Sequence, residues 1–406
     1  MHFNIVAFAV PLFLFFIGWE YLHSKKNGLQ NFHYGESVAN LNVGISERLL
    51  DLFSTGLFFY FFDFINRHFA LFNIHPTIWG WLLLFLFTDF LWYWYHRFGH
   101  EINLFWAAHV VHHQSEDYNF TVSARITLFQ SVIRSIFWSL LPLIGFPAEM
   151  ITIFLLIHGT YPFFLHTQVI GKLGWLEYVL VTPSHHRVHH AANPEYLDKN
   201  YGDILIIWDK IFGTFTEEKE IPKYGLTKNL NSYSYLWQHF HFPIELAYAC
   251  KKTKSIKGKF KILFGKPEEI NPHDREKLET IFLSKKRVRS IEYSQQLKQY
   301  VTIQTAFSLT VLFFTALLAK YLTTAQLWIL SLFIIVSLIN TGAVLEQRRW
   351  VFYLEYARLL IICAGVSIHF PNTYTILFIL TLLGLLIYYY RPAQKYYYRF
   401  LFEKSS

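Results

Sequence analysis

The sequence predicts an all-α polytopic membrane protein with about nine transmembrane helices and a cytosolic cap rich in histidine. The chain is 53% hydrophobic and 20% aromatic but only 16% charged, a composition outside the range of ordinary soluble domains. It also contains apolar stretches close to the ~20 residues that a spanning helix needs. Histidines cluster at the ends of these stretches and between them. Together these observations favour a helical membrane domain that carries a polar site at its boundary.

The expected spans follow one another along the whole chain. They are residues 4–22, 48–66, 77–95, 127–146, 148–166, 301–320, 325–342, 351–370 and 373–390. The first stretch has no positive residues before it and no small-residue cleavage site after it, so we expect an anchor and not a signal peptide. The two cysteines, Cys250 and Cys363, are too few for a disulfide framework or a thiolate metal site.

Basic residues beside the spans predict the orientation. If all nine stretches cross, one side of the membrane receives Lys25, Lys26, Arg348, Arg349, Arg391, Lys395 and Arg399. This places the N-terminus outside and the histidine clusters on the cytoplasmic side. Arg67 and His68 then lie on the opposite side. Arg134 interrupts the fourth stretch, so either it faces the protein interior or that span starts later.

The net charge of +8 is explained by cytoplasmic loops that meet anionic lipid. No compact basic domain or nucleic-acid motif is present, so we expect no nucleic-acid partner. The membrane is either a bacterial inner membrane or the endoplasmic reticulum.

The organisation of the chain predicts two domains, with residues 1–300 carrying five spans, the histidine clusters and the cap, and residues 301–406 carrying four spans. Residues 251–300 read as a solvated or amphipathic connector on the membrane surface.

Eight histidines form three clusters with internal spacings of three or four residues. The clusters are His96 with His100, then His109 with His112 and His113, and finally His186 with His189 and His190. On a helix these spacings place the imidazoles on one face. One metal rarely takes more than six protein ligands, so eight converging imidazoles predict two metals in one pocket. The scattered histidines elsewhere are expected at the surface or in hydrogen-bonded core positions.

Imidazole suits iron, copper, zinc and nickel, so the ligand type alone does not select a metal. Soluble di-iron oxygenases use Glu-x-x-His pairs, whereas this chain offers histidines almost exclusively. Neutral ligands leave more positive charge on the metal pair, which fits oxygen activation on an aliphatic C–H bond. Zinc would explain hydrolysis but would not need so many ligands.

The histidine motifs resemble those of the fatty acid hydroxylase/sterol desaturase superfamily. The matching segments are Trp92–Glu101, Ala108–Asn119 and Thr182–His190, while Asn193–Gly202 and Trp208–Phe215 look like the alkylglycerol monooxygenase branch. The resemblance is specific over about residues 80–230. It implies a non-haem di-iron centre, molecular oxygen as oxidant, a membrane lipid substrate and tetrahydrobiopterin as reductant. In that branch the ether-linked alkyl carbon is hydroxylated, and the product falls apart to a fatty aldehyde and a glycerol derivative.

Carried over by position, the resemblance implies a set of metal ligands. They are His96, His100, His109, His112, His113, His186, His189 and His190. Relatives usually supply one more histidine between the second and third clusters, for which His166 is the better match and His158 the weaker one. His185 is either a further ligand or a hydrogen-bonding neighbour that orients the ligands.

Three carboxylates are candidates for catalytic roles. Glu101 follows His100 directly, and Glu116 follows the second cluster, so either is placed to hold a ligand imidazole in its tautomer or to bridge the metals. Asp89 lies two helical turns before His96 and is expected to support the ligands. No cofactor-binding residue is identified. Asp198 and Asp209 are expected to shape the loop after the third cluster.

Two other functions remain open at the level of sequence. The first is a sterol, carotenoid or fatty-acyl hydroxylase or desaturase with the same centre and a protein electron donor. The second, from a different class, is a histidine-lined metal transporter. Transporter ligands are expected near the middle of the bilayer, whereas these clusters lie at the ends of spans and in a cytosolic segment. The sequence therefore favours a lipid oxygenase that binds its substrate from the bilayer.

Overall fold

The computed structural model describes residues 4–283 and 291–402, and within these ranges the regular secondary structure is helical, with two isolated bridges and no strand. The expected all-helical class is therefore confirmed. Residues 284–290 of the expected connector lie outside the described ranges. The chain forms two compact units, which are described separately. The histidine unit comprises Leu14–Leu230 and Gln238–Lys285, and the C-terminal unit comprises Met1–Phe13, Asn231–Trp237 and Lys286–Ser406.

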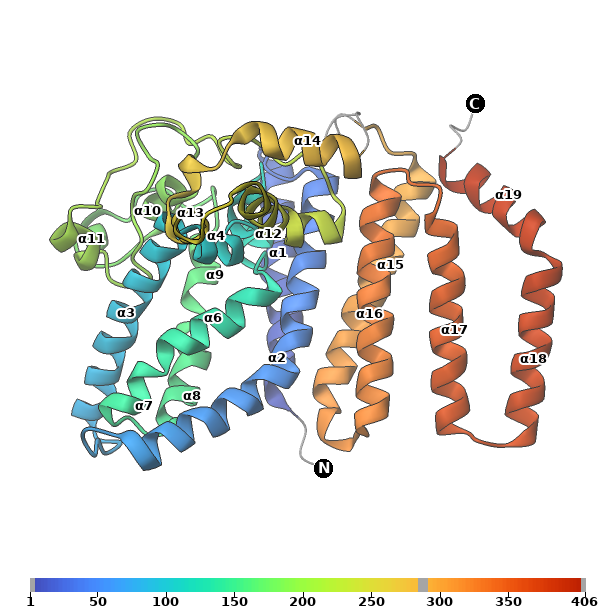
Figure 1. The fold of residues 1–406 in the computed structure, drawn as a ribbon, viewed down its shortest axis with the longest axis horizontal. Coiled ribbons are helices and arrows are strands. Elements are labelled where there is room, and N and C mark those ends of the chain that lie inside the picture. Colours follow the sequence, from blue (N-terminus) through green and yellow to red (C-terminus); the bar gives the residue numbers. More distant parts are fainter. Residues whose placement is uncertain (1–3, 284–290, 403–406) are drawn as a thin grey trace. The chain divides into compact units, whose positions relative to one another are not determined.

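The histidine unit contains the long apolar helices of the first half of the chain and a set of short helices at their upper end (Figure 1). Its longer helices are α1 (Ala9–Lys26, which begins in the other unit), α2 (Tyr34–Phe69), α3 (Ile78–Glu101), α6 (Leu128–Trp138) and α8 (Ala148–His158). Shorter helices link them, namely α4 (Asn103–His109), η2 (His112–Gln114), α5 (Phe120–Ser123), α7 (Leu140–Ile144) and α9 (Tyr161–Leu165).

The rest of this unit forms the cap. Its elements are η3 (Gly174–Tyr178), α10 (Pro183–His189), α11 (Ile207–Phe212), α12 (Tyr235–Lys252, which also begins in the other unit), α13 (Ile256–Phe264), η4 (Pro267–Glu269) and α14 (Pro272–Phe282). The segment between α10 and α11 has little regular structure, and its backbone is held by side-chain carboxylates that are described below. Two of its residues, Asp198 and Asn200, have positive φ angles of 58° and 55°, a conformation that Asp and Asn tolerate better than most residues.

An apolar core joins the lower halves of α2, α3, α7 and α8. Its buried members include Phe62, Leu84, Leu141 and Ile151. The turn after α7 closes this core at Gly145, whose φ is +129° and whose Cβ, if present, would lie 2.0 Å from the Phe72 carbonyl oxygen. Only glycine fits both the conformation and the close approach. The turn thereby brings the α2–α3 connection against the end of α7.

The C-terminal unit consists of long helices. They are α15 (Gln295–Leu317), α16 (Thr324–Leu345), α17 (Val351–His369), α18 (Thr373–Tyr388) and α19 (Tyr390–Phe402), together with η1 (Ile5–Phe8) and η6 (Ala319–Tyr321). Inside the unit, Glu355 of α17 accepts hydrogen bonds from Asn340 at 2.6 Å and from Tyr397 at 3.1 Å. Polar groups in apolar helices join helices in this way because lipid offers them no partner.

Among the described residues, five helices are long and apolar enough to cross a membrane: α2, the stretch Ala148–Leu165, α15, α16 and α17. A sixth is counted if α18 and α19, which bend by 69°, form one span. The expectation of nine spans is therefore not confirmed. The stretch expected at 127–146 is broken into α6 and α7, and α1 and α3 are not in the set. Their exposed apolar side chains nevertheless include Phe15, Leu22, Ile78 and Trp79.

Candidate metal centre

The first two histidines of the centre come from the upper end of α3. His96 and His100 are four residues apart, so their rings leave the helix on the same side. The helix ends at Glu101, and the chain turns at Ile102 into α4. Gly99 lies between the two helices, where a Cβ would sit 3.5 Å from the His109 ring. This close approach of α3 and α4 brings the first cluster to the second.

The second cluster lies where α4 gives way to a short turn. His109 is the last residue of α4, and His112 and His113 begin η2. The buried Arg125 fastens this turn, because its Nε donates to the Val111 carbonyl oxygen at 2.7 Å and its Nη1 donates to Asn40 of α2 at 2.9 Å. The adjacent His112 and His113 point in different directions from this turn, and they lie in different groups of histidines.

The third cluster is carried by α10. Pro183 occupies the first turn of this short helix, where its fixed φ is favourable and its missing N–H costs nothing. Thr182 and His185 form a capping box, in which the Thr182 N–H donates to His185 Nδ1 at 3.3 Å. His186 and His189 then project from the helix, and His190 caps its end.

Within the described part of the chain, nine histidines separate into two groups that are each able to hold one metal ion. The first contains His96, His100, His109, His113 and His189, and the second contains His112, His166, His186 and His190. The eight clustered histidines and His166, which were expected to be metal ligands, therefore lie in one group or the other. The weaker candidates His158 and His185 lie in neither group. Both groups mix residues from the second and third clusters, so each needs the folded chain.

The spacing of the ring nitrogens fits a shared cation. His109 Nε2 lies 3.1 Å from His96 Nε2 and 3.0 Å from His113 Nε2. In the second group, His166 Nε2 lies 3.1 Å from the Nε2 atoms of both His112 and His186. Two imidazole nitrogens that bind one metal at ~2.1 Å and a right angle are separated by ~3.0 Å. The observed distances match this separation.

Backbone carbonyl oxygens hold the outer nitrogen of several rings. The Nδ1 atoms of His96 and His166 lie 2.8 Å from the Tyr201 oxygen and 2.7 Å from the Pro162 oxygen. His189 Nδ1 lies 3.0 Å from the Lys199 oxygen. A carbonyl oxygen only accepts hydrogen bonds, so Nδ1 carries the proton and Nε2 turns its lone pair inward. Two facing lone pairs repel unless a cation lies between them.

The protonation state of the histidines in the two groups also favours metal binding. Burial lowers the pKa of the His112, His113 and His189 imidazoles well below the usual value, and the charge of neighbouring histidines lowers it further. These rings are therefore neutral near pH 7, which is the state in which imidazole binds metals. Nε2 of His100, His189 and His190 is buried and has no hydrogen-bond partner among the described atoms.

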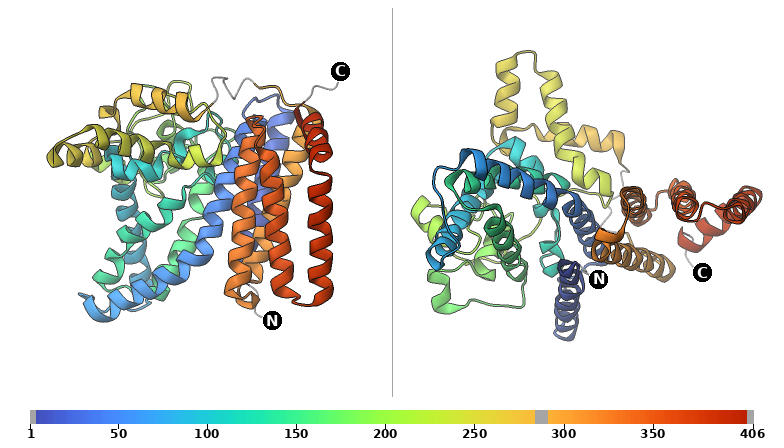
Figure 2. Two further views of the ribbon diagram at one scale, coloured as in Figure 1. Left: turned by 45° about the vertical axis from the view of Figure 1, so that its right-hand side comes forward. Right: turned by 90° about the horizontal axis from the view of Figure 1, so that it is seen from below.

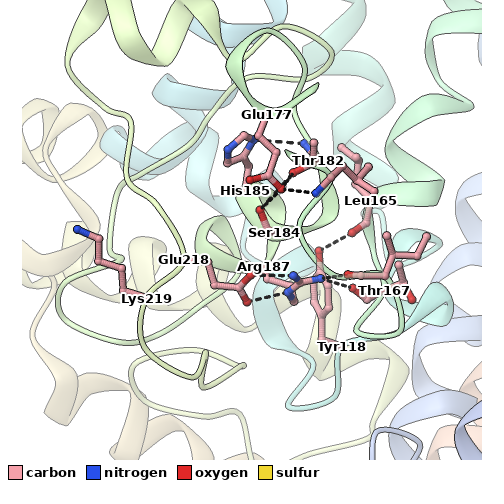
Figure 3. A network of polar contacts seen from close by, with 12 residues as sticks. Tyr118, Leu165, Thr167, Glu177, Thr182, Ser184, His185, Arg187, Glu218 and Lys219 are labelled. Carbon is pink, nitrogen blue, oxygen red and sulfur yellow. Dashed lines mark hydrogen bonds and ion pairs between the residues drawn. The ribbon is translucent and has the colours of Figure 1, made fainter. Parts of the chain in front are cut away.

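Arg187 connects the third cluster to Thr167, the residue after His166 (Figure 3). It lies between His186 and His189 in sequence and forms a two-point ion pair with Glu218, with Nε–Oε1 and Nη2–Oε2 distances of 2.7 Å each. Its Nη1 also donates to the carbonyl oxygens of Thr167 at 3.0 Å and Ile170 at 2.7 Å. One guanidinium thus joins α10, the segment after His166 and the loop at Glu218.

The three carboxylates expected to act in catalysis lie outside both histidine groups in the described structure. Glu101 pairs with Arg97 at 2.9 Å, and Glu116 packs against Gly225. Asp89 accepts hydrogen bonds from the Ile204 and Leu205 N–H groups at 2.9 and 3.1 Å and from Trp208 Nε1 at 2.9 Å. Its position shows an organising role for the loop after α10, while catalytic roles for the three remain predictions.

His158 and His185 are placed apart from the nine histidines. His158 lies beside two carboxylates, with its Nδ1 3.0 Å from Asp203 and its Nε2 3.7 Å from Asp89. His185 belongs to the capping box of α10, and its ring packs near Phe215. Sequence reasoning did not identify Asp203, Arg125 or Arg187. Arg187 was recognisable as a cation inside the third cluster, but its partner Glu218 lies 31 residues away.

Comparison with known proteins places this centre in a family. The profile of the fatty acid hydroxylase family matches residues 81–214, which include all nine histidines of the two groups. Alkylglycerol monooxygenase of Homo sapiens is 36% identical over 340 residues, which cover 80% of this chain and 74% of that protein. The chain belongs to the alkylglycerol monooxygenase family.

Other members of the alkylglycerol monooxygenase family agree with this assignment. The Danio rerio protein is 33% identical over 346 residues, covering 80% of this chain and 74% of that protein. A more distant relative is the ornithine lipid hydroxylase of Rhizobium tropici, 30% identical over 132 residues, or 32% of this chain and 39% of that protein. No solved structure matches the chain. The chain is accordingly a monooxygenase and an integral membrane protein.

Proposed function

We propose that this chain is a di-iron monooxygenase that hydroxylates the ether-linked alkyl carbon of an alkylglycerol with molecular oxygen, and that tetrahydrobiopterin is its reductant. The main support is the division of nine buried histidines into two groups with Nε2 spacings that suit metal ions. Iron bound there would activate oxygen so that one oxygen atom enters the C–H bond beside the ether oxygen, while the other leaves as water with two electrons from the reductant. The hydroxylated ether carbon is a hemiacetal, which separates into a fatty aldehyde and a glycerol derivative.

The residues of the chain would hold and protect this chemistry. The first group supplies one iron with His96, His100, His109, His113 and His189, and the second supplies the other with His112, His166, His186 and His190. Carbonyl oxygens of Tyr201, Pro162 and Lys199 keep the ligand rings oriented. The buried histidines exclude bulk water, which limits side reactions of a strong oxidant.

Access to the site follows from its position at the end of α3. A lipid tail would enter from the bilayer, and a soluble electron donor would arrive from the cytoplasmic side. We further propose that residues 1–300 form the catalytic domain and that 301–406 form a membrane region without metal ligands. In support, the described groups able to hold a metal, which are the two histidine groups and Asp89 with His158 and Asp203, all lie before residue 204.

The decisive assay uses the full-length chain in membranes with a labelled alkylglycerol, oxygen and tetrahydrobiopterin. We expect a fatty aldehyde as product and about two irons per chain, as each histidine group binds one ion. Turnover of a sterol or fatty acid without aldehyde from the alkylglycerol would refute ether cleavage. Stoichiometric zinc together with metal transport would refute an oxygenase.

Matched variants connect this activity to the two groups. His189→Ala and His112→Ala each remove a ligand from a different group, so each is expected to lose iron and at least about a hundredfold of activity. His68→Ala is the control, since its exposed ring contacts the Phe64 carbonyl oxygen of its own helix. It should retain both iron and activity. Equal iron content in all three variants would contradict the proposed ligand set.

A further inference from the structure

The helix α13 carries an exposed apolar stripe that the proposed oxygenase chemistry does not use. Ile256, Phe260 and Phe264 follow each other at intervals of four residues and are 75%, 60% and 52% exposed. Residues four apart lie on the same face of a helix, and the rings of Phe260 and Phe264 stack at 5.8 Å. Three large side chains of one short helix therefore face outward together.

Lysines border this stripe and extend beyond it. From Lys251 to Lys266 the chain holds no acidic residue, and its seven lysines are all exposed: Lys251, Lys252, Lys254, Lys257, Lys259, Lys261 and Lys266. With ~100° between successive residues, Lys257 and Lys261 lie on one edge of the stripe and Lys259 on the other. Three have acidic partners, namely Lys252 with Asp274, Lys261 with Glu269 and Lys266 with Glu268, the last two at 3.9 Å.

The inner face of α13 is tied to the protein at the height where α3 ends. Ile262 packs on a core formed by Val43, Val111 and Phe242. The buried Asn103, two residues beyond α3, donates from Nδ2 to the Ile262 and Lys266 carbonyl oxygens at 2.8 and 3.1 Å, and its N–H donates to the Gly265 oxygen at 2.9 Å. The end of α13 is thus held beside the last turn of α3.

The direction of α13 differs from that of the long helices of its unit. In Figure 1, α12 and α13 are seen end-on, whereas α2 and α3 run up the page. Both views of Figure 2 show the α12–α13 hairpin projecting from the unit, and the left view shows it at the upper end. Exposed apolar residues of α3 extend from Ile78 to Phe87 below this level. A bilayer around α3 would therefore have its surface next to α13.

We propose that α13 lies in the plane of the membrane and binds the surface of a bilayer that contains anionic lipid. Ile256, Phe260 and Phe264 enter the boundary between headgroups and acyl chains, while the flanking lysines contact anionic headgroups. Helices with one apolar face and a lysine-rich border bind membranes in this way. The absence of acidic residues from 251–266 makes the charge complementary to anionic lipid and opposed to a basic protein partner.

The test uses the full-length chain in nanodiscs of phosphatidylcholine with or without phosphatidylglycerol. After Cys250→Ser and Cys363→Ser remove the two native cysteines, a fluorophore is attached to Phe260→Cys. Quenching by a nitroxide on the lipid is compared with quenching by iodide in water. We expect strong lipid quenching and weak iodide quenching, with lipid quenching increased by phosphatidylglycerol.

Two controls separate the membrane contact from a general effect of labelling. Ile221→Cys carries the same fluorophore at a residue that is 85% exposed, so iodide should quench it freely. Lys257→Gln with Lys259→Gln, in the Phe260→Cys background, should reduce the response to phosphatidylglycerol, because each lysine near an anionic surface contributes about a fivefold gain in binding. Lysine-to-arginine replacements at both positions should retain it.

The proposal is overturned if iodide quenches the label at position 260 as strongly as the label at position 221. It is likewise overturned if a bound protein, and not lipid, protects the label at position 260. It is also overturned if lipid quenching is the same in both nanodiscs. The labelled side chain is exposed, so the substitution leaves the packing of the unit intact. Iron content and monooxygenase activity are not needed to interpret the result.

Discussion

At the scale of single residues, buried carboxylates organise the loop that follows the third histidine cluster. Asp209 accepts hydrogen bonds from the N–H groups of Tyr201 and Gly202 at 2.7 Å each and from Thr214 Oγ1 at 2.6 Å. The Tyr201 carbonyl oxygen in turn holds His96 Nδ1. Asp209 therefore helps to orient the His96 ring through the backbone of Tyr201. This agrees with the expectation that Asp209 shapes the loop.

Asp209→Asn should lower stability by about 1–3 kcal/mol, because the introduced NH2 group faces an N–H donor and leaves a buried donor unpaired. We expect a lower midpoint of thermal unfolding and a faster loss of iron during dialysis. Glu217→Gln is the matched control, since it makes the same carboxylate-to-amide change at an exposed side chain after the loop. Equal midpoints for the two variants would count against this role of Asp209.

A second prediction at the scale of single residues concerns Arg187. A lysine cannot reproduce the two parallel contacts with Glu218 and also donate to the Thr167 and Ile170 oxygens. Arg187→Lys should therefore destabilise the chain by about 2–4 kcal/mol. Arg67→Lys, which changes an exposed pair with Asp63, should cost less than about 1 kcal/mol. Denaturant titration of both variants measures the difference.

At the scale of helices, close packing depends on small residues at particular contacts. Gly44 of α2 faces Ala124, just after α5, and a Cβ at Gly44 would lie 2.7 Å from the Ala124 Cβ and 2.8 Å from its carbonyl oxygen. This contact brings α2 against the segment that ends at Arg125, whose side chain holds the turn of the second cluster. A helix far from the histidines in sequence thereby supports their position.

Gly44→Ala should lower stability by about 1–3 kcal/mol, because the Ala124 backbone has to move to admit the new methyl group. Gly56→Ala on the same helix is the matched control, since a methyl group there would meet no atom of a neighbouring element within 4 Å. It should be neutral or stabilising by up to about 1 kcal/mol, as alanine favours helices. Thermal midpoints in one detergent test both, and a more stable Gly44→Ala variant would contradict the contact.

At the scale of the whole molecule, we expect metal binding and folding to be coupled, since the two histidine groups exist only in the folded chain. Removal of metal by a chelator should lower the midpoint of thermal unfolding, and added iron should restore it. At a free metal concentration of about one hundred times Kd, the expected gain is about 2.7 kcal/mol. The His112→Ala, His189→Ala double variant should show no such gain, whereas His68→Ala should behave like the unaltered chain.

Much of the fold could be predicted from local patterns. Long apolar stretches predicted the helical class, and helical spacing predicted that histidines of one cluster share a face. The number of spans was less accessible, because hydropathy does not reveal where α6 and α7 or α8 and α9 break. The family resemblance implied that His166 is a ligand, but its grouping with His112 and His186 was not predicted, since the three lie on separate segments.

The sequence by itself determined which side chains this protein offers for chemistry: clustered imidazoles, apolar helices and a basic amphipathic segment after α12. These properties depend on residue types and on spacings within a few turns of helix. Only the tertiary structure decided how the ligands divide between two groups, that His158 faces Asp89 and Asp203, and that Asp89 fastens the loop at Ile204. Such contacts join residues that are distant in sequence, and no local periodicity encodes which of them the folded chain brings together.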